Sequence, residues 1–181
     1  MSDLTEEQIE WAGEAIGQLG GAEPQDWFVI YGREAERREA VADALQEALR
    51  DRGVDTTALV VLPMQCRVQP LRPAEMEEVG WTRPGRDAES DSPAIRGSIS
   101  PGPLTIRRFR VRDGDVLVCR APGGEQRERL VQGCKDMVQA WDLDVLTLGL
   151  TPGQALHDLP PEEMEAYGWQ RPGEEPQDAV A

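Results

Sequence analysis

Three arginines directly follow short apolar runs that are typical of strands, and they are the residues of this chain best suited to binding an anion. They are Arg33, Arg67 and Arg120. In α/β sheets, ligands bind outside the carboxyl ends of the strands, and a guanidinium group can hold a phosphate or a carboxylate through two hydrogen bonds. We therefore expect the three side chains at one sheet edge, either as an anion site or paired with the chain's many carboxylates.

A second feature with possible anion chemistry is Gly123-Gly124, which leads from a predicted strand into a predicted helix. Free amides at a helix N-terminus favour anions. However, the Gly-Lys-Ser/Thr ending of a phosphate-binding loop is missing, as is Gly-x-Gly-x-x-Gly, and Glu125 can occupy the positive helix end itself. The geometry of the turn is the simpler explanation of the two glycines.

Residues used in catalysis and metal binding are few. The single histidine, His157, is expected to be a solvated loop residue. Cys119 and Cys134 are expected in the core, whereas Cys66, at a strand end, is expected to be accessible. With no paired cysteine spacing and no nucleophile elbow, the sequence predicts no metal and no cofactor, and it does not indicate an enzyme. Four aspartates at the amino ends of the strands argue against a two-carboxylate site: Asp26, Asp55, Asp115 and Asp144.

The most distinctive pattern is a duplicated segment. Residues 71–85 recur as residues 159–173, with ten of fifteen positions identical. Methionine and tryptophan bury a large area at a small entropic cost, so those of the duplicated segment are either anchors for a protein partner or covers of the core. With a tryptophan of the N-terminal helix, the candidate interface residues are Met76, Trp81, Met164, Trp169 and Trp11.

The duplication extends upstream at the same spacing of 88 residues. It aligns residues 27–31 with 115–119, 34–52 with 125–141, and 57–62 with 145–150. Each copy is therefore predicted to contain, in this order, a strand, a helix, a strand, an irregular loop and a short helix. This order predicts an α/β fold of two duplicated βαβ units with a largely parallel or mixed sheet; the alternative is a ferredoxin-like split βαβ arrangement. We expect an approximate dyad between the copies.

Two elements lie outside the duplication. An amphipathic helix is predicted at 5–19, opened by a capping box at Thr5. An arginine-rich strand is predicted at 104–112, where it should occupy a sheet edge and form a hairpin through Asp113-Gly114. The predicted organisation is the N-terminal helix with the first repeat at 1–83, a linker at 84–103, the edge strand with the second repeat at 104–173, and a flexible acidic tail at 174–181.

The charge limits the classes of partner. Asp and Glu number 34 against 19 Lys and Arg, which gives a formal charge of −15. Such a field repels nucleic-acid backbones and anionic membrane surfaces, so neither is expected as a partner. The N-terminus does not resemble a signal peptide, no apolar stretch could span a bilayer, and the three cysteines are widely spaced. A cytoplasmic location, or one in a particle assembled there, is therefore expected.

The runs at 113–119 and 144–153, with the Arg- and Glu-rich helix between them, resemble small uncharacterised β-helix-β proteins encoded by bacteriophages. The resemblance implies a viral or prophage origin at most and transfers no catalytic residues. We expect a non-enzymatic binding or assembly protein that uses the Met/Trp segments against a protein partner or a second copy. The alternatives are a small-ligand or phosphate-binding module at the arginines, and an enzyme of unknown class.

Overall fold

The computed structural model describes residues 6–84 and 93–171. The predicted tail and the first part of the predicted linker lie outside these residues, as does Thr5. The helices are α1 (Glu6–Gln18), α2 (Ala35–Asp51), α3 (Pro73–Glu78), α4 (Gly124–Ala140) and α5 (Pro161–Glu165), with a 3-10 turn η1 (Leu156–Asp158). The strands are β1 (Asp26–Gly32), β2 (Ala58–Pro63), β3 (Arg67–Leu71), β4 (Ile95–Ile99), β5 (Leu104–Arg110), β6 (Val116–Arg120) and β7 (Leu146–Leu150).

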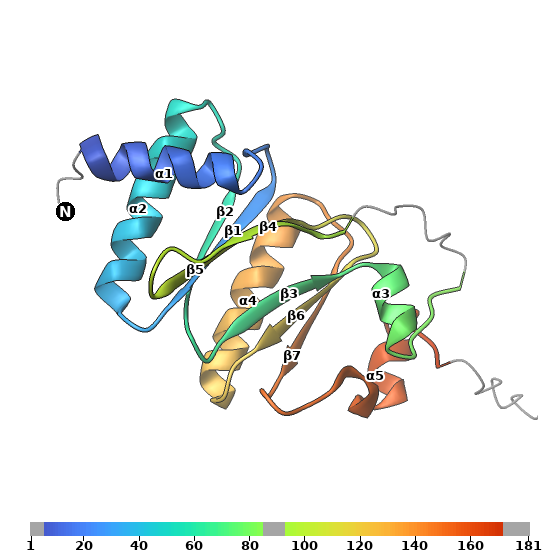
Figure 1. The fold of residues 1–181 in the computed structure, drawn as a ribbon. Helices are drawn as coiled ribbons and strands as arrows, with labels where there is room; N and C mark the ends of the chain where they lie inside the picture. The colour runs from blue at the N-terminus through green and yellow to red at the C-terminus, as the bar shows by residue number, and fades with distance from the viewer. Residues whose placement is uncertain (1–5, 85–92, 172–181) are drawn as a thin grey trace, which may run out of the picture.

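The fold is α/β, as predicted, with the strands divided between two mixed sheets (Figure 1). One sheet has the order β2-β1-β5-β4 and the other has the order β3-β6-β7. Only β1–β2 and β6–β7 are parallel, and they are the two predicted βαβ pairs. Of the two predicted forms, a largely parallel or a mixed sheet, the structure has the mixed form, because an antiparallel strand is added to each parallel pair.

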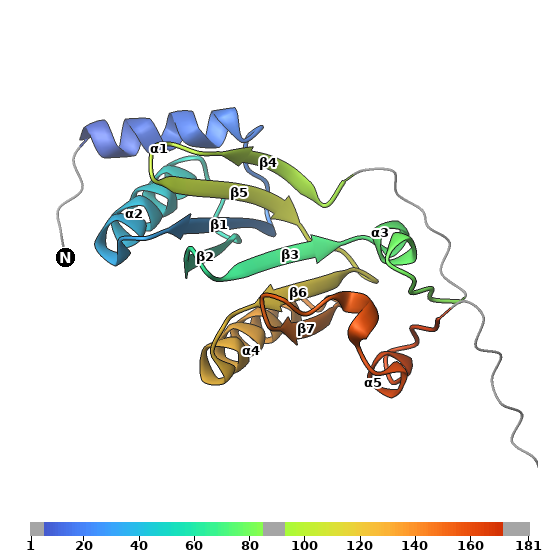
Figure 2. The same ribbon diagram turned by 60° about the horizontal axis from the view of Figure 1, so that its bottom comes forward.

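The added strands exchange between the two halves of the chain. Strand β5 precedes the second repeat but pairs with β1 of the first, and β3 follows the first repeat but pairs with β6 of the second (Figure 2). Strand β5 lies between β1 and β4, so its predicted edge position and its predicted hairpin with β6 are both wrong. Strand β3 was predicted as an irregular loop, and β4 lies within the predicted linker.

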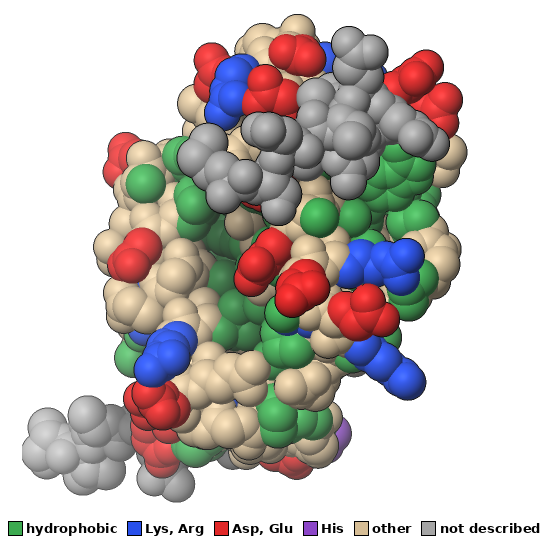
Figure 3. All heavy atoms as spheres, turned by 90° about the vertical axis from the view of Figure 1, so that its left-hand side faces the viewer, with side chains coloured by type: hydrophobic (Ala, Val, Ile, Leu, Met, Phe, Trp, Pro, Cys, Tyr) green, Lys and Arg blue, Asp and Glu red, His purple; other side chains and the backbone are tan. Residues whose placement is uncertain are grey.

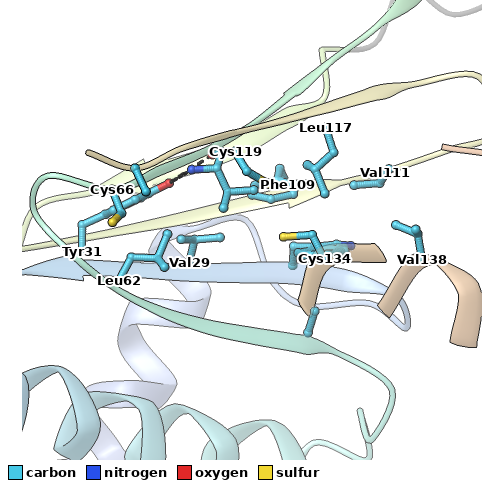
Figure 4. Packing of buried hydrophobic residues seen from close by; sticks show 14 residues of the cluster. Val29, Tyr31, Leu62, Cys66, Phe109, Val111, Leu117, Cys119, Cys134 and Val138 are labelled. Carbon is cyan, nitrogen blue, oxygen red and sulfur yellow. Dashed lines mark hydrogen bonds between the residues drawn. The ribbon is translucent and has the colours of Figure 1, made fainter. Parts of the chain in front are cut away.

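Three clusters of buried side chains form successive layers. Helices α1 and α2 pack on one face of the four-stranded sheet, around Phe28, Ile30 and Ile106. The opposite face of this sheet meets the second sheet and α4 in a central cluster (Figure 4). In this cluster the Tyr31 hydroxyl donates to the carbonyl of Val68 on β3 at 3.1 Å and accepts from its amide at 3.2 Å. The third cluster lies on the far face of the second sheet, under α3 and α5.

The two copies match with an offset that changes along the chain. Helices α2 and α4 both have 17 residues and begin 89 positions apart, whereas α3 and α5 begin 88 positions apart. The loop between helix and second strand is one residue shorter in the second copy. The uniform spacing of 88 therefore misaligns the first strand, because Asp26, rather than Trp27, corresponds to Asp115. A shift of one residue exchanges the two faces of a strand.

The expected dyad is limited to one end of the molecule. Helix α2 packs in the outer cluster of its sheet, whereas α4 places Cys134 and Val138 in the cluster between the sheets. A dyad would put both helices on corresponding sides, so it does not relate the βαβ units. The duplicated segments do meet about a local twofold axis, since Thr82 and Gln170 exchange backbone hydrogen bonds of 2.8 and 2.7 Å.

Candidate functional site

Two of the three predicted arginines are brought side by side. Strand β3 runs antiparallel to β6, and Arg67, the first residue of β3, lies opposite Arg120, the last residue of β6. Arg33 follows the last residue of β1 and is exposed. The structure adds Arg107 of β5, whose guanidinium carbon is 5.7 Å from the centre of the Tyr31 ring. We call these four side chains the arginine edge.

Backbone oxygens and an aromatic ring hold the arginine side chains in place. The Arg67 guanidinium donates to the carbonyls of Met64 at 2.5 Å and Cys66 at 2.9 Å, and its carbon is 4.9 Å from the centre of the Tyr31 ring. Arg120 donates to the carbonyls of Thr151 and Gln154. In each case both hydrogen bonds come from one terminal nitrogen, Nη1, which leaves the rest of the planar group for other acceptors.

The arginine edge lacks carboxylate partners. Among the described residues, none of Arg33, Arg67, Arg107 and Arg120 forms an ion pair with Asp or Glu. Figure 3 views the side of the molecule toward which β1 and β6 run, where both basic and acidic side chains lie around a hollow lined with hydrophobic groups. In a chain with 34 carboxylates against 19 basic residues, this is an unexpected place for unpaired arginines.

At the opposite ends of the strands, arginines form ion pairs with buried aspartates. Asp26 is fully buried, and its carboxylate binds Arg108 at 2.7 Å and Arg110 at 2.9 Å. Asp115 is also buried and pairs with Arg72. Each aspartate additionally accepts an amide hydrogen bond of 2.8 Å from the residue three positions before it.

These two buried ion pairs are equivalent features of the two copies. In each, an arginine at or just after the end of the antiparallel strand neutralises the aspartate at or just before the start of the first parallel strand: Arg110 ends β5, and Arg72 follows β3. Burial raises the pKa of Asp115 to about 6, although the amide of Arg112 and the charge of Arg72 lower it. The sequence analysis placed Asp26 and Asp115 at the amino ends of strands but did not predict their ion pairs with arginine. The available signal was the recurrence of Asp after 89 residues.

The geometry of the turn into α4 does not explain Gly123 and Gly124, contrary to the prediction. Gly123 is the N-cap of α4 with φ −90° and ψ 142°, a conformation open to any residue, and neither it nor Gly124 has a positive φ. The turn therefore does not require glycine. Glu125 of the first helical turn is exposed and pairs with Arg129 of the next turn.

The predicted interface side chains are part of the core. Met76, Trp81, Met164 and Trp169 are each 0% exposed and lie together in the cluster beneath α3 and α5. They present no surface to a partner in this structure, which corrects the expectation that they act as anchors. Trp11 of α1 is half-buried and lines a hollow beside Ile99, Ser100 and Pro101.

The cysteines are all free and buried. The expectation that Cys66 is accessible is wrong, because its side chain turns into the central cluster, and burial raises the pKa of its thiol. A hydrogen bond with Cys134, together with burial, raises the pKa of the Cys119 thiol well above its ordinary value. His157 is exposed, 3.3 Å from Asp158.

Other site classes find no support in the part of the chain that the structure describes. It contains no group of three side chains suited to binding a metal, and none of its helices combines the length and the apolar character needed to cross a bilayer. Compared with family models, with curated proteins and with solved structures, this chain has no match in any of the three.

Proposed function

We propose that this protein is a non-enzymatic binding protein whose site is the arginine edge and whose ligand is a small anion, a phosphate or carboxylate group. The observation that carries the proposal is the direct cross-strand neighbourhood of Arg67 and Arg120 without a carboxylate partner among the described residues. Two arginines on directly opposite residues of β3 and β6, at the carboxyl end of β6, provide several donors in planes suited to a tetrahedral or planar anion.

The size of the ligand follows from the charge of the whole chain. With a net charge of −15, the protein repels long polyanions, so the proposal concerns a compact anion rather than a nucleic acid. The local field differs, since Arg67 and Arg107 both lie within 6 Å of the Tyr31 ring and attract anions at short range. Contacts between arginine and the Tyr31 ring also restrict the side chains before binding.

The experiment is a thermal-unfolding titration with potassium phosphate, pyrophosphate and succinate, each compared with potassium chloride of equal ionic strength. A ligand that binds the folded state at one hundred times its Kd stabilises it by about 2.7 kcal/mol. The stabilisation should be lost in Arg67→Gln and Arg120→Gln. It should persist in Arg50→Gln, because Arg50 is an exposed arginine paired with Glu47 on α2. An equal response of all variants, or no response of the wild type to any of the anions, contradicts the proposal.

We also propose a cytoplasmic protein of phage or prophage origin. The buried, unpaired state of Cys66, Cys119 and Cys134 supports a reducing compartment. The resemblance of the second βαβ unit to phage-encoded proteins supports the origin, and the genes next to the coding sequence test it.

A further inference from the structure

An apolar groove separates strand β2 from helix α4. It has a volume of about 440 Å³, and its walls are residues 59–63 of β2 and Leu130, Gly133 and Met137 of α4. This volume lies within the range of small-molecule sites, which are largely apolar with a few polar groups. The groove is distinct from the arginine edge, because it contains none of the four arginines that define the edge.

The groove exists because two elements of different units lie beside each other without filling the space between them. Strand β2 is the edge strand of the four-stranded sheet, and α4 packs on β6 and β7 of the other sheet. On the α4 side, Gly133 contributes no side chain. A Cβ atom placed there would meet no atom within 4 Å.

One residue that lines this groove carries a buried polar atom without a partner among the described residues. Trp27 of β1 is 0% exposed and lines the groove, and its indole Nε1 has no hydrogen-bond acceptor among the described residues. Trp81 shows the usual arrangement, since its Nε1 donates to the carbonyl of Leu156 at 3.0 Å. A buried donor left unpaired destabilises the fold, so such groups normally have a partner, which can be a ligand.

The indole of Trp27 is held in one orientation. Its ring stacks on Phe109 at a centroid distance of 5.5 Å and meets the edge of Trp141 at 5.8 Å. The donor is therefore positioned before any ligand binds, which reduces the entropic cost of binding.

We propose that the groove between β2 and α4 binds a small, mostly apolar molecule with one hydrogen-bond acceptor, and that Trp27 Nε1 donates to this acceptor. The apolar part of the ligand lies between the β2 side chains and Leu130 and Met137. Gln126 and Arg129 also line the groove and supply its polar contacts. This site is independent of the arginine edge.

The test follows the five tryptophan indole N–H resonances in ¹⁵N-labelled protein during titration with 1-octanol and, separately, with octanoate. Trp27→Phe assigns the Trp27 resonance. Both probes carry an acceptor and an eight-carbon chain, so both should shift this resonance in a saturable manner. A site at the arginine edge would instead respond to octanoate but not to 1-octanol, and Arg67→Gln would abolish that response.

Gly133→Leu fills the groove at a helical position with free space, so the variant should fold. We expect it to weaken binding of both probes roughly tenfold or more. Gly17→Leu is the matched control, because Gly17 is an exposed helical glycine with equally open surroundings on α1; it should bind as the wild type does. The proposal is overturned if neither probe moves the Trp27 resonance, or if Gly133→Leu binds both probes as tightly as Gly17→Leu.

Discussion

The buried carboxylates differ in how completely their charge is compensated. Asp26 contacts the guanidinium groups of Arg108 and Arg110, whereas Asp115 forms its ion pair with Arg72. Removing a charge from water is costly unless a partner of opposite charge and hydrogen bonds replace the water. The desolvation of Asp115 is the larger influence, which is why the pKa of this carboxyl is raised to about 6.

This raised pKa gives stability a defined pH dependence. Between the ordinary pKa of 3.8 and about 6, the folded state binds a proton at Asp115 that the unfolded state does not. The resulting stabilisation is complete below the lower value and is lost as the pH rises through about 6. We expect the free energy of unfolding of the wild type, relative to Asp115→Asn, to fall when urea titrations are repeated from about pH 4 to about pH 7. Parallel profiles would contradict this, and Asp43→Asn controls for the loss of one surface charge.

The two equivalent tryptophans also differ in one hydrogen bond. Trp81 Nε1 donates to Leu156, whereas Trp169 Nε1 is buried without a partner among the described residues. Replacing Trp81 by Phe removes the shorter of two hydrogen bonds that the Leu156 carbonyl accepts, the other coming from the Leu159 amide at 3.3 Å. The same change at Trp169 removes an unsatisfied donor. Trp81→Phe should therefore destabilise the protein by about 1 kcal/mol more than Trp169→Phe in urea denaturation. An equal or reversed order would show that the hydrogen bond contributes nothing.

Strand β4 depends on a glycine that lets helix α1 approach the sheet. A Cβ atom on Gly97 would be 2.8 Å from the carbonyl oxygen of Leu19 and 3.1 Å from its Cα. Both atoms belong to the backbone at the end of α1, which cannot move without displacing the helix. The arginine-rich strand β5 serves the same junction, because Arg108 donates to the carbonyls of Leu19 at 3.3 Å and Gly20 at 2.8 Å.

Gly97→Ala should consequently separate α1 from the sheet and destabilise the protein by roughly 1–3 kcal/mol, a typical result of overpacking. Gly17→Ala on α1 is the control, because a Cβ atom at that position would meet no atom within 4 Å. Denaturant titration compares the two. Similar losses would show that β4 and α1 are not tightly joined.

The molecule is joined into one unit by its central cluster. This cluster takes side chains from both sheets and from α4, and it contains Cys66, Cys119 and Cys134. Because strands are exchanged between the halves, neither sheet can form from one half of the chain alone. Cooperative unfolding of the whole described core is the expected consequence.

The thiols test this cooperativity. In the native protein, an aromatic disulfide reagent should label Cys66, Cys119 and Cys134 slowly, because all three thiols are buried and the reagent cannot reach them. In increasing urea, labelling of the three should accelerate together, with the same midpoint as the loss of near-ultraviolet circular dichroism. Rapid labelling of Cys66 in buffer, or separate midpoints for the single-cysteine variants, would show local opening.

Local patterns were sufficient for the helices, the four strands of the βαβ pairs and the duplication itself. Apolar residues at helical spacing define α1, α2 and α4 to within one or two residues of their observed ends. The same patterns placed Arg67 and Arg120 just after strands. The structure brings the two together, although Arg67 begins β3 and Arg120 ends β6. These features depend on residues that are near each other in sequence, where periodicity and turn chemistry are readable.

Strand partners, sheet number and side-chain burial were decided by the tertiary structure. The Asp26–Arg108 pair joins residues 82 positions apart across the β1–β5 pairing. A local pattern does not specify which distant strand supplies the partner. Burial of the Met/Trp segments and of Cys66 likewise follows from the stacking of the two sheets, since apolar surface is removed from water wherever packing is complete.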